Sequence, residues 1–157
     1  MDKNTALAYA INFLVQNSCE NPYNEARWII QELLADKEST SPILEQEDIT
    51  LLNSLLQRRI KGEPLQYVLG NVDFHCLRLS VGPGVLIPRP ETEILVEEAL
   101  SLYPGSGDIC DLCTGSGAIA LAMAKQLPKA SFIAADISKE ALFWARLNQR
   151  DTQLNNV

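Results

Sequence analysis

Several features are scarce or absent in this sequence. No apolar run approaches the roughly 18 residues that a membrane-spanning helix needs, and the start MDKNTALAYA lacks a basic segment that leads into a hydrophobic one. We therefore expect a cytoplasmic protein with no membrane association. The chain also lacks internal repeats and low-complexity segments, and 46% apolar with 21% charged residues is an ordinary globular composition, which argues against disorder.

Histidine is nearly absent, since His75 is the only one beside four cysteines. Cys110 and Cys113 form a Cys-x-x-Cys pair, but a structural zinc site needs a second pair of ligands and the sequence offers no regular one. We therefore predict no metal site. The simpler interpretation places Cys110 in the core of a strand and Cys113 in a loop that requires a small side chain, with the thiols reduced.

Basic side chains are scarce in the first third of the chain. Residues 1–50 carry nine acidic and three basic side chains, a net charge of -6, whereas residues 51–157 carry eleven and ten, a net charge of -1. Such an acidic segment repels phosphate backbones, which excludes direct nucleic-acid binding by it and favours a basic protein partner. A solvated helical surface explains the charge equally well.

Apolar residues in the first part recur at the spacing of amphipathic helices. The stripes cover residues 7–15, 26–34 and 47–61. Asn21 and Pro22 are typical of the start of the second helix, and residues 39–42 of a break after it. Gly62 and Pro64 end the third. The sequence therefore predicts a helical bundle over residues 1–64.

The pattern changes after Pro64. Residues 65–87 mix aromatic and β-branched side chains, with alternation around Phe74 that predicts a β-hairpin connector. From residue 88 onward, helices and strands alternate as in a βαβ unit, and Ser138 is a plausible N-cap. The expected elements are a helix at 91–102, a strand at 108–111, a helix at 117–126, a strand at 131–136 and a helix at 138–148. The expected fold class is α/β.

The stretch DLCTGSGAIALAMA, residues 111–124, has a glycine-containing loop between a strand and a helix, which is typical of nucleotide binding. Asp136 lies 21 residues after Gly115, where an acidic side chain accepts hydrogen bonds from ribose hydroxyls. The glycines fit a dinucleotide as well as a methyl donor. Asp111 favours S-adenosyl-L-methionine, because a carboxylate attracts its ammonium and sulfonium charges and repels a diphosphate.

Three motifs in order, GEPLQYVLG, LIPRPETE and DLCTGSGAIAL, carry a family resemblance. The chain resembles the protein-(glutamine-N5) methyltransferases of peptide chain release factors. The resemblance implies methylation, during translation termination, of the glutamine amide nitrogen in their Gly-Gly-Gln motif. It further implies a helical substrate-recognition domain over residues 1–64, the connector over 65–87, and over 88–157 the first part of a Rossmann-like methyltransferase domain.

The resemblance also assigns site residues. The cofactor-binding set is Asp111, Cys113, Thr114, Gly115, Ser116, Gly117 and Asp136, and the candidate pocket lining is Phe74, Pro88, Arg89 and Thr92. Two positions depart from the family pattern: Cys113 replaces a glycine before Thr114, and Cys76 stands where glycine is frequent. Arg89 fits a carboxylate pair equally well. Arg58, Arg59 and Lys61 either contact an acidic partner or, as a helix end favours, act as C-terminal caps.

One family element is missing from the sequence. An amide nitrogen is a poor nucleophile and needs hydrogen-bond acceptors to hold it in line with the methyl group. The family uses Asn-Pro-Pro-Tyr, which the resemblance places beyond Val157, and no Asn-Pro-Pro occurs here. We therefore expect a catalytically incomplete piece of a longer enzyme. A fragment of an NAD-dependent oxidoreductase and a non-enzymatic binding module remain the alternatives.

Overall fold

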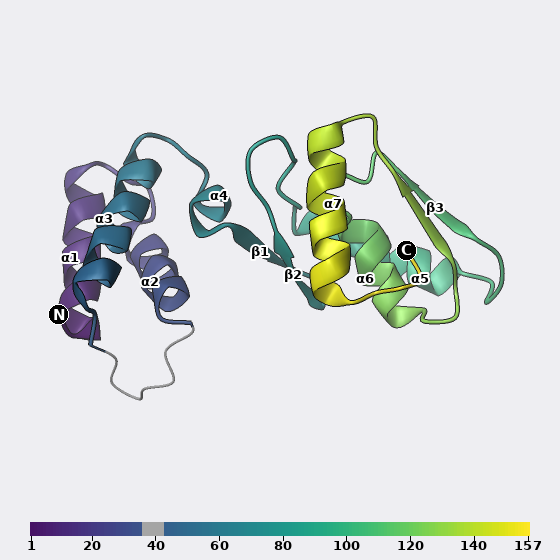
Figure 1. Ribbon diagram of the computed structural model, residues 1–157, viewed down its shortest axis with the longest axis horizontal. Coiled ribbons are helices and arrows are strands. Elements are labelled where there is room, and N and C mark those ends of the chain that lie inside the picture. Colours follow the sequence, from purple (N-terminus) through teal and green to yellow (C-terminus); the bar gives the residue numbers. More distant parts are fainter. Residues whose placement is uncertain (36–42) are drawn as a thin grey trace. The chain divides into compact units, whose positions relative to one another are not determined.

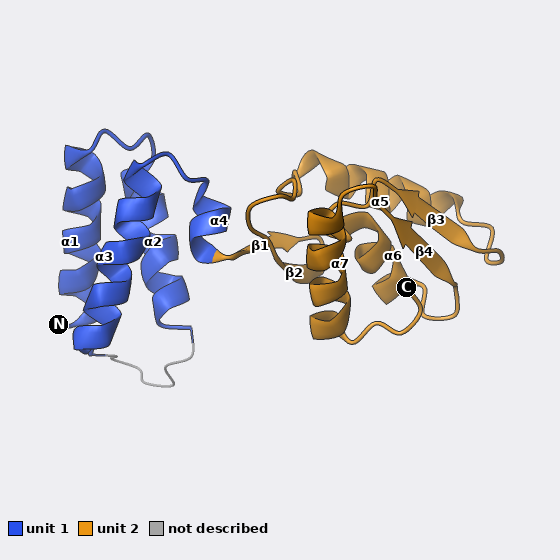
Figure 2. Cartoon of the chain, turned by 45° about the horizontal axis from the view of Figure 1, so that its top comes forward, with its two compact units in different colours: residues 1–69 blue, residues 70–157 orange. Residues whose placement is uncertain are grey.

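A computed structural model of the chain describes residues 1–35 and 43–157, so the break expected at 39–42 lies outside the described residues. The chain divides into two compact units, Met1–Leu69 and Gly70–Val157, shown in different colours in Figure 2. None of the helices in the described ranges has the length and apolarity that crossing a bilayer requires.

Helices form the first unit (Figure 1). Their bounds are α1 (Lys3–Gln16), α2 (Pro22–Leu33), α3 (Gln46–Ile60) and α4 (Leu65–Leu69). Asp2 caps α1, because its side chain accepts two backbone N–H groups of the first turn at 3.0 Å. Glu45 and Asp48 form a reciprocal capping box at the start of α3. The three longer helices are those that the apolar spacing predicts.

The apolar stripes of these helices meet in one core. Its buried members are Ala6, Ala10, Leu14, Ala26, Ile29, Ile30, Leu34, Leu44, Leu52, Leu56 and Leu65. Each leucine or isoleucine there contributes about 1.5–3 kcal/mol relative to an exposed position. Val15, at the edge of the first predicted stripe, is 48% exposed. The unit is therefore stabilised mainly by side chains that the helical period brings to one side.

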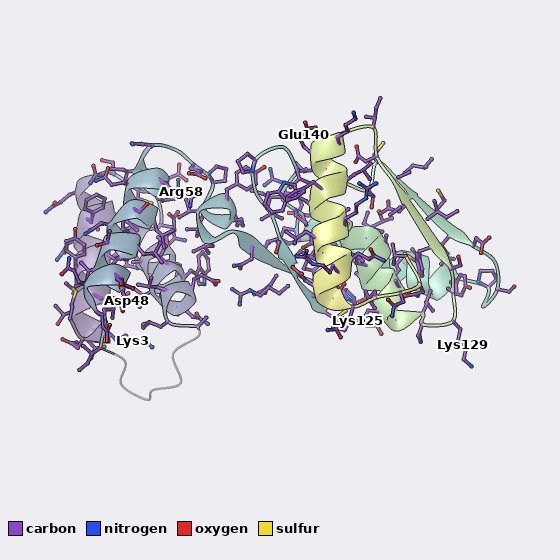
Figure 3. The ribbon with its side chains drawn as sticks, in the orientation of Figure 1. Lys3, Asp48, Arg58, Lys125, Lys129 and Glu140 are labelled. Atoms are coloured by element: carbon purple, nitrogen blue, oxygen red, sulfur yellow. The ribbon has the colours of Figure 1, made fainter. Side chains whose placement is uncertain are left out.

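Two neighbouring arginines of α3 donate hydrogen bonds to carboxylate and carbonyl oxygens of the first unit (Figure 3 labels Arg58). Arg58 donates to Glu63 at 2.8 Å and to two carbonyl oxygens of α4 at 2.8 and 3.2 Å. Arg59 donates to Glu25, with 3.0 Å between Nη2 and Oε1. Hydrogen bonding to these carboxylates raises the pKa of both guanidinium groups. The structure thus favours internal pairing and capping over contact with an outside partner.

Residues 65–69 differ from the predicted hairpin connector, because they form helix α4 inside the first unit. The carbonyl of Pro64 accepts the N–H groups of Tyr67 and Val68, both at 3.0 Å, so the proline begins the helix. Leu65 and Val68 are buried, a helical i, i+3 spacing. A short, mostly apolar run fits a strand and a helix equally well, so the spacing of apolar residues did not predict helix α4.

The second unit holds a hairpin and a βαβ arrangement. Its elements are β1 (Asn71–Phe74), β2 (Leu77–Ser80), α5 (Glu91–Leu102), β3 (Ile109–Leu112), α6 (Ala118–Gln126), β4 (Phe132–Ala135) and α7 (Lys139–Thr152). β1 pairs antiparallel with β2, and β3 pairs parallel with β4. The Ser138 hydroxyl accepts the Ala141 N–H at 3.1 Å, which confirms the predicted N-cap of α7. An α/β fold with the beginning of a Rossmann-like sheet is confirmed.

The two faces of the β3–β4 pair differ in burial. α6 is almost wholly buried, from Ala118 to Ala124, and packs with Phe132 in the core of the unit. On the other face, Cys110 is exposed beside Leu112, which is 72% exposed, and Ile133, which is 56% exposed. The expectation that Cys110 lies in the core is therefore wrong, because nothing in the described part of the chain covers this face.

Candidate methyl-donor site

The loop between β3 and α6 contains three residues in the left-handed backbone conformation. Cys113, Gly115 and Gly117 have φ angles of 62°, 60° and 82°. Glycine adopts this region freely, whereas a residue with a Cβ is strained there. The backbone therefore explains why glycine suits position 113, the first of the two family departures.

Backbone hydrogen bonds hold the loop against β4 and close its turn. The Thr114 N–H donates to the carbonyl of Ala135 and the Gly117 N–H to that of Thr114, both at 2.9 Å. A Cβ on Gly117 would lie 3.0 Å from the Leu121 side chain and 3.5 Å from Ala145 of α7. Glycine at 117 thus permits both the turn and the close approach of the two helices.

Asp111, near the end of β3, points its carboxylate into the loop. Its Oδ2 atom accepts the Thr114 hydroxyl at 2.6 Å and the Ala120 N–H at 3.2 Å. The second bond occupies one of the free N–H groups of the first turn of α6 with a negative charge. No bond to Oδ1 is found among residues 1–35 and 43–157. A diphosphate at this helix start would meet the carboxylate, while a cationic ligand would be attracted.

Asp136, directly after β4, holds the other side of the loop. Its Oδ2 accepts the Gly115 N–H and its Oδ1 the Ser138 N–H, both at 2.9 Å. These two bonds, the one from Ser138 foremost, lower the pKa of Asp136 below its ordinary value. The group is therefore ionised at neutral pH, and each oxygen keeps a further lone pair for a ligand hydroxyl.

The structure brings the seven predicted cofactor residues together around this loop, but not all side chains are accessible. Thr114 is 7% exposed and Ser116 is 2% exposed, so these two offer a ligand little beyond their backbone. Cys113 is exposed. The accessible groups of the set are thus one thiol, the two aspartates and the loop backbone.

The four predicted pocket-lining residues are placed differently. Phe74 is 1% exposed in the core of the second unit, because the hairpin packs it among apolar residues; it does not line an open pocket. Pro88 and Thr92 are half-buried, and Arg89 is exposed two residues before α5 begins. Among the described residues, Arg89 has no ion-pair partner, which leaves its guanidinium available.

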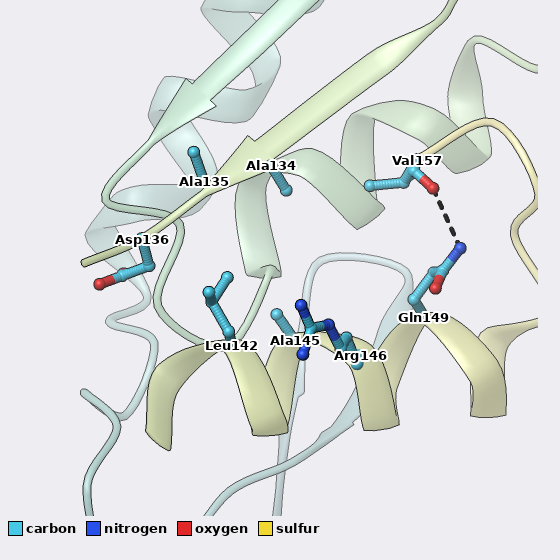
Figure 4. Close-up of a pocket in the computed structure, with 8 residues that line it drawn as sticks. All are labelled: Ala134, Ala135, Asp136, Leu142, Ala145, Arg146, Gln149 and Val157. Atoms are coloured by element: carbon cyan, nitrogen blue, oxygen red, sulfur yellow. Dashed lines mark hydrogen bonds between the residues drawn. The ribbon is translucent and has the colours of Figure 1, made fainter. Parts of the chain in front are cut away.

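A pocket of about 410 Å³ adjoins the site between β4 and α7 (Figure 4). Asp136 lines one end, and Gln149 with Val157 lines the other, where the Gln149 amide donates to the Val157 carbonyl at 3.0 Å. Of the loop and its two aspartates, only Asp136 reaches this pocket. The loop and the pocket are therefore neighbouring features that share one carboxylate.

Two residues of the site escaped the sequence analysis. Ile137 follows Asp136 and is 98% exposed, an isolated apolar surface beside a carboxylate. Asn148 of α7 is 1% exposed and donates to the carbonyl of Ser116 in the loop. A signal existed for the second, because Asn148 continues the spacing of Ala141 and Ala145 on the buried face of the helix.

Comparison with known families matches the chain in two consecutive parts. Residues 5–70 match the PrmC N-terminal domain, and residues 90–157 match the methyltransferase small domain. A release factor glutamine methyltransferase of Vibrio cholerae is 41% identical over 158 aligned positions, which cover 97% of this chain. The chain belongs to the release factor glutamine methyltransferase family. The first match covers most of the helical unit and ends one residue after it, and the second begins just before α5.

Other members of this family are similarly close. The release factor glutamine methyltransferase of Thermodesulfovibrio yellowstonii is 45% identical over 121 residues (74% of this chain, 43% of the relative). That of Neisseria gonorrhoeae is 52% identical over 97 residues (62% of this chain, 36% of the relative). The Vibrio cholerae match covers 55% of that relative. The chain thus spans about half the length of the curated relatives it matches.

Proposed function

We propose that this chain forms the substrate-recognition and methyl-donor-binding part of a release factor glutamine methyltransferase. The whole enzyme would transfer a methyl group from S-adenosylmethionine to a glutamine side-chain amide nitrogen of peptide chain release factors. The helical unit, residues 1–69, would recognise the release factor, the segment 70–87 with its hairpin would connect, and residues 88–157 would bind the methyl donor. The names of the relatives support the substrate class, and the acidic first third suits a basic protein partner.

The observation that carries the donor assignment is the hydrogen bond from the Ala120 N–H to Asp111. A dinucleotide needs free N–H groups at the start of this helix for its diphosphate, and here a carboxylate takes one of them. The same carboxylate favours the ammonium and sulfonium groups of S-adenosylmethionine. Asp136 would bind the ribose hydroxyls, and exposed Ile137 offers an apolar surface for the purine ring.

The bound donor would supply an electrophilic methyl group on a positively charged sulfur. The chain's own residues would hold it: the loop from Cys113 to Gly117 around the methionine end, and the two aspartates at its charged and ribose ends. No Asn-Pro-Pro sequence is present to accept the hydrogens of the substrate amide. We therefore propose that the 157-residue chain binds S-adenosylmethionine but does not catalyse transfer of its methyl group. Methylation of release-factor glutamine by this chain would contradict that part.

Calorimetric titration of the full chain with S-adenosylmethionine and, separately, with NAD tests the donor assignment. We expect binding of the first only, and a loss of about tenfold in affinity for Asp111→Asn, because one charge interaction is removed. Asp108→Asn is the matched control, since Asp108 is exposed just before β3. Binding of NAD in preference to S-adenosylmethionine would overturn the proposal in favour of an oxidoreductase.

A further inference from the structure

The side-chain amide of Asn148 joins three backbone groups from two distant segments. Its Nδ2 donates to the carbonyl of Ser116 at 2.9 Å and to that of Ser80 at 3.0 Å, and its Oδ1 accepts the Ser80 N–H at 2.6 Å. Ser80 ends β2 and Ser116 lies in the middle of the loop. One buried side chain therefore links the hairpin to the loop through α7.

The orientation of this amide is fixed by its partners. An N–H can only donate and a carbonyl can only accept, so the Ser80 N–H requires the oxygen on one side and the two carbonyls require the NH₂ on the other. The bond to Ser116 is buried and the two bonds to Ser80 are partly buried, while Asn148 itself is 1% exposed. A buried carbonyl that loses its donor costs stability, so the native arrangement strongly favours this one loop geometry.

The bond to Ser116 acts on the peptide that precedes Gly117. The N–H of that same peptide donates to the Thr114 carbonyl at 2.9 Å, so both its ends are held. On the other side of Ser116, the Gly115 N–H is held by Asp136. Two residues that are distant in sequence, Asp136 and Asn148, therefore hold the strained turn. Of the two, Asn148 is buried and Asp136 is accessible at the site.

α7 also packs closely against both linked segments. A Cβ on Gly82, two residues after Ser80, would lie 2.4 Å from the Trp144 ring, and a Cβ on Gly117 would lie 3.5 Å from Ala145. Both approaches lie about one turn of α7 from Asn148, so the helix is closely packed against the hairpin and the loop near this residue.

We infer that Asn148 is a positioning residue for the methyl donor: it holds the Ser116 carbonyl, and with it the loop from Cys113 to Gly117, in the conformation that binds the ligand. This inference rests on the proposed function of the loop. Asn148 itself does not contact the S-adenosylmethionine molecule in this scheme. It acts only through the backbone that it holds.

The test compares Asn148→Asp with Asn156→Asp in the full chain. Both asparagines donate to backbone carbonyls through Nδ2, but Asn156 binds those of Ala124, Leu127 and Ala130 (3.1–3.2 Å), at the end of α6 remote from the loop. N148D keeps the acceptor for Ser80 and loses the donors. We expect both variants to unfold at a lower temperature, while only N148D loses affinity for S-adenosylmethionine, by about tenfold or more.

Two further readouts separate positioning from stability. Protonation of the N148D carboxyl restores one donor, so its affinity should recover partly as the pH falls, whereas that of N156D should not. In the unsubstituted chain, which requires no variant to fold, titration with S-adenosylmethionine should shift the ¹H–¹⁵N signals of the Asn148 side-chain amide and leave those of Asn156 in place.

The outcomes distinguish the two levels of the proposal. If the unsubstituted chain does not bind S-adenosylmethionine, the proposed function fails and the inference falls with it. If that chain binds and N148D binds equally well, or loses no more affinity than N156D, the inference alone is overturned. Unchanged Asn148 signals on saturation with the donor would also overturn it.

Discussion

The two units of this chain use their buried polar groups in different ways. Among residues 1–35 and 43–69 of the helical unit, the buried charged residue is Glu25, which pairs with Arg59. In the second unit the buried polar residues are Thr114, Ser116 and Asn148, all in or bonded to one loop. The buried polar groups of the first unit therefore join two helices, whereas those of the second unit hold the backbone of the proposed ligand-binding loop.

The units also differ in how completely apolar surface is covered. Leu56 in the helical unit is 0% exposed, while Leu112 on the sheet of the second unit is 72% exposed. The same residue type is therefore under opposite constraints in the two regions, which makes a direct experimental comparison possible.

The largest expected effect comes from that pair of leucines. Leu56→Ala should lower the free energy of unfolding by about 3 kcal/mol, since it removes buried methyl groups and leaves a cavity. Leu112→Ala should change it by less than about 0.5 kcal/mol, because the side chain faces water. Urea unfolding followed by circular dichroism measures both. Equal losses for the two variants would show that the units do not differ as described.

A smaller loss is expected when the ion pair of the helical unit is broken. Arg59→Met leaves the Glu25 carboxylate, whose side chain is 9% exposed, without its partner. Breaking a fully buried pair costs about 3–5 kcal/mol, and the partial exposure of Arg59 reduces this to about 2. The double variant Glu25→Gln with Arg59→Met should recover part of the loss in the same unfolding measurement. No recovery would mean that Arg59 acts through packing alone.

Replacement of Cys113 by glycine should stabilise the second unit. Its φ of 62° strains a residue that has a Cβ, so Cys113→Gly should raise the free energy of unfolding by about 0.5–1 kcal/mol. The control is Cys110→Gly, in the extended backbone of β3, where the same change should destabilise by a similar amount. Thermal unfolding of the two variants gives the sign directly, and a loss at both positions contradicts the account of the turn.

The smallest effect concerns pH. Hydrogen bonding to the Cys76 side chain first, and to Glu97 second, raises the pKa of His75; its Nε2 lies 2.6 Å from the Glu97 carboxylate. A raised pKa in the folded state means that this stabilisation is fully present below the ordinary histidine value of about 6.5 and is lost as pH rises through the folded value.

Glu97→Gln should therefore lower the pKa of His75 and flatten the loss of stability above pH 6.5, the ordinary histidine value. NMR titration of the imidazole gives the pKa, and thermal unfolding across the same pH range gives the stability. Glu98→Gln, on the next residue of α5, is the matched control and should leave both unchanged. An unshifted His75 pKa in E97Q would remove Glu97 as a cause.

The sequence predicts those parts of the fold that depend on local patterns. α5, residues 91–102, lies where the sequence predicts a helix, and Ser138 caps α7 as predicted. α4 was missed because a five-residue apolar run has no readable period. The glycine loop and Asp136 were predicted from their spacing, whereas the full set of site residues came from the family resemblance.

Burial and long-range polar contacts were beyond the reach of the pattern. Cys110 was expected inside and is exposed, while Phe74 was expected at a pocket and is in the core. In both cases the answer depends on which element packs against a given face. Asn148 lies 32 residues from Ser116 and 68 from Ser80, so only the folded chain reveals that it serves both.

The uncovered sheet face has a practical meaning for work with this chain in solution. One face of the β3–β4 pair exposes the side chains of Cys110, Leu112 and Ile133. This apolar face lies next to strand edges that can pair with a neighbouring molecule. Samples should therefore associate as concentration rises, and air oxidation should cross-link them through the thiol on that side. A reducing agent and dilute protein are the conditions under which the donor loop can be studied in a single, dispersed molecule.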